Sequence, residues 1–337
     1  MKIAIISKLW ESTDPYSTGG TGMSVGTLVN GLIKRGHQIT VFAAANSKTK
    51  AELISVKSRP YKNNYSEVKE YQNIYRAFKD AHKFDVIHTN IEHKACFFAP
   101  LIKTPTLITL RYGQFFKDEI DLLKDNRKLN FSFNSIALQK KLSFLNSVGV
   151  VYNGLNLDNY RFNSKPEDYL LFLGRLSPQK GVHLAVKAAL KSKHTLIIAG
   201  KTVKADEQYL KKYVLPFVDN KKIIYLGEQG FRQKIELLKN AYALIQPTQF
   251  FEACSNSILE AQACGTPVIT FNQGSNKELL KNFKTGILAN QKNLVKSIEF
   301  IKKIKRSVCR RWIESNFSQQ RMVSGYEHLY EKLVKKI

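Results

Sequence analysis

Short apolar runs alternate with longer amphipathic segments over the first part of the chain. A helix is predicted at about 22–35, where apolar positions recur at helical spacing up to Gly36. The short runs are bounded by polar or turn-forming residues, which is typical of buried strands. We interpret four of them as strands: KIAIIS (2–7), HQITVFAA (37–44), DVIHTN (85–90) and TLITL (106–110). Strands that alternate with helices predict an α/β fold with a doubly wound parallel sheet.

The same alternation starts again after a polar, turn-rich stretch near 155–167. Helices are predicted at about 180–192 and 204–215. The predicted strands are YLLFLGRL (169–176), HTLIIAG (194–200), KIIYLGE (222–228), YALIQPT (242–248) and PVITF (267–271). We therefore expect two Rossmann-like domains, at 1–160 and 161–317, with a cleft between them.

A final helix is predicted at 318–337, because four apolar side chains fall on one of its faces. These are Met322, Tyr326, Leu329 and Tyr330.

Composition fits a globular protein that works in a reducing compartment. The chain has 337 residues, of which 43% are hydrophobic and 24% charged. No apolar run approaches the roughly 18 residues of a membrane span, and we interpret MKIAIISKLW as a first strand instead of a secretory signal. The four cysteines, Cys96, Cys254, Cys264 and Cys309, form no CxxC pair and no zinc-ligand pattern. We expect reduced thiols and a cytoplasmic location.

The charge is strongly positive. Fifty-three basic residues against 27 acidic ones give a net charge of +26. Such an excess favours polyanionic partners: nucleic acid, an anionic lipid surface or a phosphorylated substrate. The alternative is a lysine-rich surface with no particular partner. The basic residues are dispersed and no nucleic-acid-binding signature accompanies them, so we expect no nucleic-acid partner.

The stretch FFEACSNSILEAQACGTPVI (250–269) carries the clearest candidate chemistry. It places a loop after one predicted strand and a helix before the next, and such loops bind ligands in parallel α/β folds. Small residues at the helix start (Ser255, Asn256 and Ser257) would let an anion approach the helix amides. Glu260 could accept hydrogen bonds from two ribose hydroxyls, and Glu252 could reach a group beyond the phosphates. The alternative for Glu260 is a capping box with Ser257, which needs no ligand.

Two further segments change the balance. GRLSPQKG (174–181) places Arg175 and Lys180 at the same strand edge, where both could bind phosphate. STGGTGMS (17–24) is a glycine-rich loop before the first helix, although it follows its strand too late for the dinucleotide fingerprint. Either segment alone could be an ordinary surface loop. Together with the acids, they favour a cleft that binds a nucleoside diphosphate carrying a third group.

At this point the chain resembles the GT-B glycosyltransferases of the retaining family 4. The resemblance covers nearly the whole chain and rests on an ordered set of motifs. They are the GGTG loop followed by KRGHQITVFA, then DVIH (85–88), VVYNGLNLDNY (150–160), LGRLSPQKG (173–181), IIAG (197–200), LGE (226–228), the E-x7-E from Glu252 to Glu260, and CGTPVI (264–269). The tail FSQQRMVSGYEHLY resembles the helix that crosses back onto the first domain.

The resemblance also implies roles for individual residues. Arg175 and Lys180 would bind the donor diphosphate and stabilise the leaving nucleotide. Glu260 would bind the ribose and Glu252 the donor sugar, with backbone amides near Ser255, Asn256 and Ser257. Gly20 would approach the phosphates on closure, and the base would lie near Gly200 and Lys201. No D-x-D motif occurs, so we expect no metal and no cofactor. Glu252 is not assigned as a nucleophile, since such enzymes generally lack an evident one.

One departure concerns the acceptor side. Many family members place a histidine after the strand that corresponds to TLITL, whereas this chain has Arg111. The histidine's role would be lost, shifted or taken by Arg111. His88 is the nearest matched histidine and a second acceptor-side candidate, but histidines at strand ends are often simply packed.

The functional hypothesis is a retaining hexosyltransferase that moves a sugar from a nucleotide donor, with UDP favoured over GDP. The acceptor would be a glycan or lipid-linked saccharide in cell-surface polysaccharide or lipopolysaccharide synthesis. The basic amphipathic segment 301–312 and the aromatic, lysine-rich segment 115–145 would suit peripheral contact with an anionic inner membrane face. Three alternatives stay open: a non-catalytic partner subunit, another enzyme on the same fold such as a sugar-nucleotide epimerase or a phosphorylase, and a nucleic-acid-binding protein.

Overall fold

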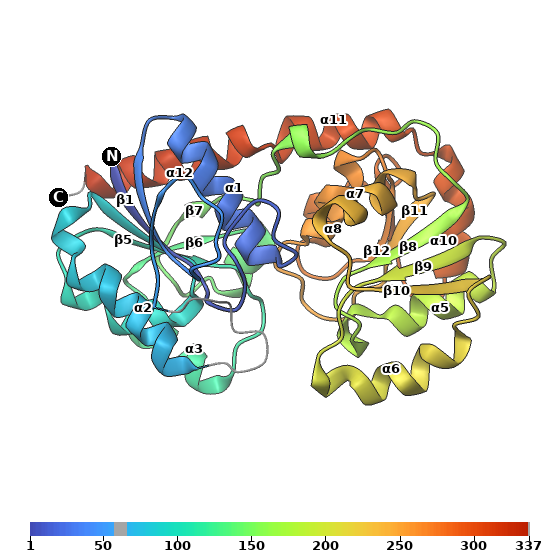
Figure 1. Ribbon diagram of the computed structural model, residues 1–337, viewed down its shortest axis with the longest axis horizontal. Helices are drawn as coiled ribbons and strands as arrows, with labels where there is room; N and C mark the ends of the chain where they lie inside the picture. Colours follow the sequence, from blue (N-terminus) through green and yellow to red (C-terminus); the bar gives the residue numbers. More distant parts are fainter. Residues whose placement is uncertain (57–65, 336–337) are drawn as a thin grey trace. The chain divides into compact units, whose positions relative to one another are not determined.

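The protein is described here from a computed structural model that covers residues 1–56 and 66–335. The chain forms two compact units (Figure 1). Unit 1 comprises Met1–Leu155 and Gln319–Ile337, and unit 2 comprises Asn156–Ser318. In the described ranges, no helix has both the length and the apolar character needed to cross a membrane.

Unit 1 is built on a seven-stranded sheet of order β3-β2-β1-β4-β5-β6-β7 in which all neighbours are parallel. Its strands are β1 (Lys2–Ile6), β2 (Gln38–Phe42), β3 (Glu52–Ile54), β4 (Val86–Thr89), β5 (Thr106–Leu110), β6 (Asn130–Phe133) and β7 (Ser147–Val150). The strand order reverses between β1 and β4, which makes their carboxyl ends the topological switch point of the sheet.

Helices and short 3-10 turns connect these strands. They are α1 (Gly20–Lys34), α2 (Glu67–Lys79), α3 (Lys117–Asp125), α4 (Ile136–Lys141), η1 (Ala81–Lys83), η2 (Glu92–Phe97) and η3 (Ala99–Leu101). The chain's last helix, α12 (Gln319–Val334), belongs to this unit and packs on α1 and β7. Its four predicted apolar positions, Met322, Tyr326, Leu329 and Tyr330, are all buried in the core of unit 1.

Unit 2 repeats the architecture with a six-stranded parallel sheet of order β10-β9-β8-β11-β12-β13. Its strands are β8 (Tyr169–Leu173), β9 (Thr195–Ala199), β10 (Ile223–Gly227), β11 (Ala243–Gln246), β12 (Val268–Phe271) and β13 (Gly286–Ala289). Here the order reverses between β8 and β11. The two parallel sheets confirm the α/β class predicted from the alternation of elements.

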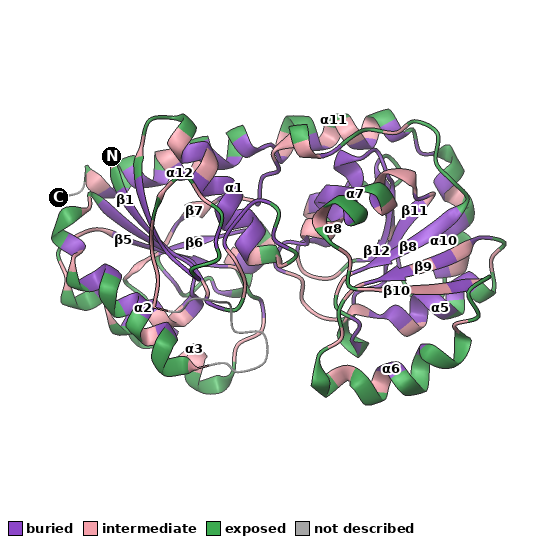
Figure 2. Cartoon of the chain, in the orientation of Figure 1, coloured by how far each residue is buried: buried purple, intermediate pink, exposed green. Residues whose placement is uncertain are grey.

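The α-helices of unit 2 are α5 (Val182–Leu190), α6 (Glu207–Tyr213), α7 (Phe231–Asn240), α8 (Asn256–Ala263), α9 (Asn276–Leu279), α10 (Leu294–Phe300) and α11 (Arg306–Asn316). The 3-10 turns are η4 (Leu157–Asn159), η5 (Pro178–Lys180), η6 (Lys204–Asp206), η7 (Leu215–Phe217) and η8 (Ile301–Lys303). In both units the strands are mostly buried, and helices such as α2 and α6 expose one face (Figure 2).

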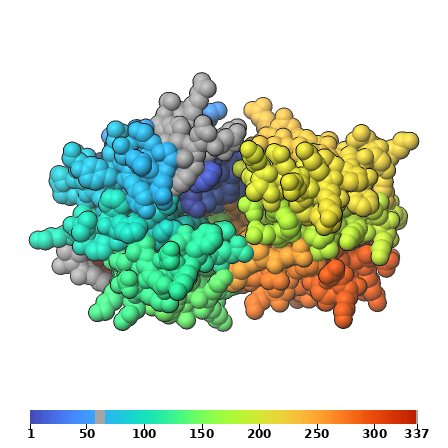
Figure 3. All heavy atoms as spheres, turned by 90° about the horizontal axis from the view of Figure 1, so that it is seen from below, coloured from blue at the N-terminus to red at the C-terminus, as the bar shows by residue number. Residues whose placement is uncertain are grey.

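Two segments expected to form membrane-facing patches contribute much of their apolar surface to the cores instead. In 115–145, Phe131 and Phe133 lie on β6 and are fully buried. In 301–312, Ile301 and Ile304 belong to the core of unit 2, and Arg306 is buried. Part of the apolar pattern of both segments therefore reflects packing within each unit. The 115–145 segment still reaches the surface of unit 1 (Figure 3), where Phe116 is 81% exposed.

Candidate functional site

The carboxyl edge of the unit 2 sheet is held together by direct backbone contacts between its loops. Gly174 N–H donates to Ala199 O (3.1 Å), and Gly200 N–H donates to Gly227 O (2.8 Å). A Cβ atom on Gly200, which has φ of 155°, would lie 1.8 Å from Gly174 O. Only glycine permits this approach. The loops after β8, β9 and β10 thus form one rigid edge, on which the side chain of Lys201 is exposed.

Lys180 and Glu252 meet at the switch point of this edge. Lys180 follows β8 in η5, Glu252 follows β11, and their Nζ and Oε2 atoms lie 2.5 Å apart. The two side chains are 18% and 13% exposed. Gly181, with φ of 76°, lets the Lys180 loop pack on the β11 loop, because a Cβ there would lie 2.2 Å from Pro247 O. The ion pair therefore rests on a tightly fitted backbone.

Arg175 lies beside this pair but is held more loosely. Its Nη2 donates to Gln179 Oε1 (2.9 Å), and its Nε lies 3.7 Å from Asp206 Oδ2. The side chain is 42% exposed. A second cation thus stands at the same edge with much of its guanidinium open to solvent.

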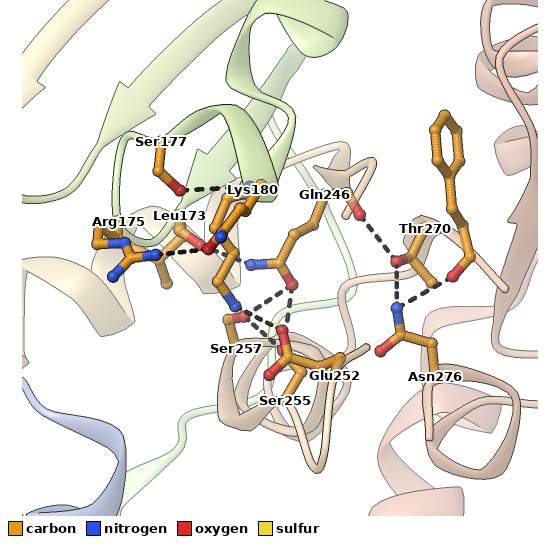
Figure 4. A network of polar contacts seen from close by, with 12 residues as sticks. Leu173, Arg175, Ser177, Lys180, Gln246, Glu252, Ser255, Ser257, Thr270 and Asn276 are labelled. Atoms are coloured by element: carbon orange, nitrogen blue, oxygen red, sulfur yellow. Dashed lines mark hydrogen bonds and ion pairs between the residues drawn. The ribbon is translucent and has the colours of Figure 1, made fainter. Parts of the chain in front are cut away.

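Gln246 at the end of β11 fixes the loop that carries Ser255 and Ser257 (Figure 4). Its Nε2 donates to Leu173 O on β8 (3.0 Å), and its Oε1 accepts from both serine hydroxyls (3.1 and 3.0 Å). Ser255 is the N-cap of α8 but makes no side-chain cap bond, since its hydroxyl is used by Gln246. The small residues at 255–257 are therefore positioned by the strand ends, and Asn256 begins the helix.

Glu260 lies one turn into α8, apart from Glu252. It is 3% exposed, and its Oε1 accepts from Lys234 Nζ (2.5 Å) and Tyr160 Oη (3.1 Å). The capping box that the sequence left open does not form, because Ser257 and Glu260 bind other partners.

In unit 1, Gly20 begins α1, and the carboxylate of Glu11 covers that end of the helix. Gly22 N–H donates to Glu11 Oε1 (2.7 Å), and a Cβ on Gly19 would lie 0.9 Å from Glu11 Oε2. The glycines of this loop thus leave space for the carboxylate of Glu11, whose negative charge is favourable at the positive end of the helix dipole.

His88 is fully buried on β4. Its Nδ1 pairs with Tyr330 Oη (2.7 Å) and its Nε2 with Thr109 Oγ1 (2.7 Å). Burial, together with the charge of Arg111, holds the pKa of His88 well below its usual range, so the ring is neutral. A neutral ring has one donor and one acceptor nitrogen, and both are used here. This placement fits the packed alternative.

Arg111 is half-buried, and each of its three guanidinium nitrogens donates a hydrogen bond within unit 1. Nε donates to Asn90 Oδ1 (2.8 Å), Nη1 to Asn153 Oδ1 (2.7 Å) and Nη2 to Tyr326 Oη (3.2 Å). These partners follow β4, follow β7 and lie on α12, respectively. In this structure Arg111 links three elements of its own unit.

Two residues that position the unit 2 site escaped the sequence analysis, Gln246 and Lys234, and so did Glu11 at the start of α1 in unit 1. A signal existed for the first two. Gln246 is a polar residue at the end of a buried strand, and Lys234 lies on the face of α7 that buries Leu238 one turn later. Glu11 gave no such signal, because it lies in a loop without periodicity.

The described side chains include no group of three or more His, Cys, Asp or Glu that could hold a metal ion. What the unit 2 edge offers is two cations, one acid paired to a cation, and a helix start. This arrangement can hold an anionic, hydroxyl-rich ligand.

Two doubly wound parallel α/β units are the architecture of the GT-B fold. Two family models together match most of the chain: Glycosyltransferase Family 4 at residues 18–125 and Glycosyl transferases group 1 at 158–319. The chain belongs to the group 1 glycosyltransferases, and it is an enzyme of that class.

Individual relatives agree with this assignment. The uncharacterized glycosyltransferase MJ1607 of Methanocaldococcus jannaschii is 25% identical, over 87% of this chain and 86% of its own length. Four further curated relatives match over only 45–55% of their length. Among solved structures, sucrose-phosphate synthase from Thermosynechococcus elongatus has a TM-score of 0.83 at 17% identity and full coverage of both chains. Anabaena HepE, solved with UDP and glucose, has a TM-score of 0.79 at 17% identity, over 99% of this chain and 100% of its own.

Proposed function

We propose that this glycosyltransferase takes its sugar from a nucleotide-diphosphate donor and transfers it with retention of anomeric configuration. The observation that carries the proposal is the Lys180–Glu252 pair at the β8/β11 switch point, with Arg175 beside it. Ligands of doubly wound sheets bind at this position. The donor's diphosphate takes over Lys180 from Glu252, which frees the carboxylate to accept hydrogen bonds from sugar hydroxyls.

The cations supply the main catalytic effect. As the bond between the sugar's anomeric carbon and the diphosphate oxygen breaks, negative charge grows on the diphosphate. Lys180 and Arg175 stabilise that charge, which is worth about 10²–10³ in rate for one well-placed donor. The acceptor hydroxyl forms the new bond on the same face of the sugar, and its proton passes to the leaving diphosphate oxygen. Since two side-chain cations do this work, the reaction needs no metal.

Uridine is the base we propose first. HepE, which shares the fold over essentially the whole chain, was solved with UDP and with UDP-glucose. In this protein the base would lie against the fitted backbone of Gly200 and Gly227, with Lys201 exposed nearby.

The acceptor that we propose is a glycan or lipid-linked saccharide of the cell surface. Support comes from the net charge of +26 and from exposed apolar side chains on unit 1 near the lysines of 117–141, including Phe116 and Ile136. Both features suit contact with an anionic membrane face.

A donor screen tests the proposal. The purified protein is incubated with UDP-, GDP- and ADP-sugars, with and without EDTA, and thermal shift and free nucleotide are measured. We expect one donor to stabilise the protein and to be slowly hydrolysed, equally with EDTA. The reason is that the site's own cations should suffice for both binding and bond weakening.

Lys180→Ala and Glu260→Ala are the site variants in this screen, and Lys239→Met on α7 is a matched surface control. Both site variants should lose the stabilisation, whereas the control should keep it. If no nucleotide sugar stabilises the wild-type protein, the donor proposal is wrong and a non-catalytic partner role moves to first place.

A further inference from the structure

The carboxylate of Glu260 is held from one side only. Lys234 Nζ, on α7, lies 2.5 Å from Glu260 Oε1, and Tyr160 Oη donates to the same oxygen at 3.1 Å. Within the described residues, no hydrogen bond to the side chain of Glu260 falls on Oε2. Two donors on one oxygen fix the plane of the carboxylate and leave the other oxygen to a further donor.

The two donors are themselves fixed. Lys234 Nζ lies 5.0 Å from the centroid of the Phe231 ring, and Tyr160 packs edge-on against the same ring at 6.0 Å. Lys234 and Tyr160 are 8% and 3% exposed. Burial, and secondarily the charge of Glu260, raises the pKa of Tyr160 well above its usual range, so its hydroxyl keeps its proton and donates.

Burying the Lys234–Glu260 ion pair costs desolvation free energy, and a core of apolar side chains would avoid that cost. A carboxylate that is 3% exposed needs a counter-charge, and buried ion pairs often contribute little to stability when compared with well-packed apolar residues. A buried acid whose orientation is fixed through one oxygen is, however, well suited to hold a ligand hydroxyl at a set angle.

We propose that Lys234 and Tyr160 are positioning residues that orient Glu260 so that its Oε2 accepts the 2′-hydroxyl of the donor nucleotide's ribose. The inference rests on the proposed function, because it requires a ribonucleotide at this edge. Lys234 supplies the charge and Tyr160 the second hydrogen bond, and neither touches the nucleotide. Together they set the preference for ribose over 2′-deoxyribose.

The test measures that preference by calorimetric titration. The probes are UDP and 2′-deoxy-UDP, with the GDP and ADP pairs in parallel; the pair whose ribonucleotide binds wild-type protein most tightly is used. We expect the ribonucleotide to bind about tenfold more tightly or better, as for one hydrogen bond to a charged group. Glu260→Gln should reduce this ratio to about twofold.

Lys234→Met should bring the ratio close to that of Glu260→Gln, with little change in 2′-deoxynucleotide affinity, and Lys234→Arg should restore much of it. Tyr160→Phe keeps the ion pair, so it tests the proposal even if Lys234→Met does not fold; we expect a fall of about threefold. Lys239→Met, a lysine of α7 paired with Glu236, is the control and should leave the ratio unchanged.

The outcomes separate the two proposals. If Glu260→Gln abolishes ribose preference while Lys234→Met and Tyr160→Phe retain it, the positioning role is overturned and the donor site stands. If wild-type protein binds the two nucleotides equally, Glu260 does not hold the 2′-hydroxyl and the inference fails, while the donor site stands because a nucleotide still binds there.

Discussion

Each of the two sheets has a lysine–glutamate ion pair at its switch point. In unit 1, Lys8 follows β1 and pairs with Glu92 after β4 at 3.0 Å. In unit 2, Lys180 follows β8 and pairs with Glu252 after β11 at 2.5 Å. Each lysine follows the first strand of its unit, and each acid follows the strand across the reversal.

What surrounds the pairs differs. The second oxygen of Glu92 accepts the backbone N–H of Arg111 (3.0 Å), and Glu92 is held at a φ of 58°. The guanidinium of Arg111 then donates hydrogen bonds to Asn90, Asn153 and Tyr326. In unit 2 the arginine at the edge, Arg175, is 42% exposed, and its side-chain partners among the described residues are Gln179 and, at 3.7 Å, Asp206.

The comparison shows that residue type does not decide the role of a strand-end cation. An arginine whose three guanidinium nitrogens each donate to an oxygen of its own unit is part of the structure. An arginine with open donors can exchange its partners for a ligand. Arg111 and Arg175 should therefore respond to mutation in opposite ways.

The largest expected effect is on stability, from Arg111→Ala. The change removes two charge-assisted hydrogen bonds to the buried side chains of Asn90 and Asn153, which should lower the free energy of unfolding by about 3 kcal/mol. Thermal and urea unfolding measure it, with Arg111→Lys as a partial rescue. Nucleotide affinity should stay within about twofold of wild type, because these contacts lie in unit 1. A stable variant without activity would instead assign Arg111 to the reaction.

Arg175→Ala should produce the reverse pattern. Its contacts are exposed, so stability should change by less than about 0.5 kcal/mol. Turnover of the donor identified in the screen should fall about 10²-fold, since a cation aimed at the leaving diphosphate is lost. Steady-state kinetics measure this, and Arg175→Lys should recover part of the rate. A loss of stability without a loss of rate would place Arg175 with Arg111.

The sequence predicted the central strands of both sheets because each is a short apolar run between turns. TLITL is β5 as the structure has it. It did not predict β3, β6, β7 or β13, and two of these show the physical reasons. Asn130–Phe133 is a four-residue strand within a stretch whose leucines and lysines suggested a surface patch. Gly286–Ala289 begins with a glycine, which is a weak strand former, and the fold needs it there because a Cβ would lie 2.4 Å from Val268 O.

For the site, the sequence predicted which residues carry charge at the unit 2 edge, because motif spacing places them after strands. It could not predict their partners, which come from residues far away in the chain. Lys180 and Glu252 are 72 residues apart, and Arg111 reaches Tyr326 across 215. Those pairings distinguish the edge of unit 2, where Arg175 is partly exposed, from the edge of unit 1, where Arg111 binds other residues of its own unit.

The smallest expected effect is a pH dependence of unit 1 that comes from His88. Burial holds its pKa in the folded protein well below the value of about 6.5 of an unfolded chain. At pH 7.5 and above the ring is almost wholly neutral in both states, so this part of the stability is present. At lower pH the unfolded chain takes up a proton that the folded protein excludes, and stability falls by up to about 1.4 kcal/mol per pH unit.

His88→Gln keeps a donor and an acceptor for Tyr330 and Thr109 but removes the titration. Burial also lowers the pKa of His93 and His183, so the stability of the variant keeps the pH dependence that comes from these two residues. Between pH 7.5 and 5.5, urea unfolding of the wild-type protein should therefore lose about 1 kcal/mol more than that of the variant. Equal losses would mean that His88 reaches solvent before unit 1 unfolds. The hydrogen-bonded chain from Tyr330 to Thr109 would then open locally, and the edge of unit 1 would be less closed than its contacts imply.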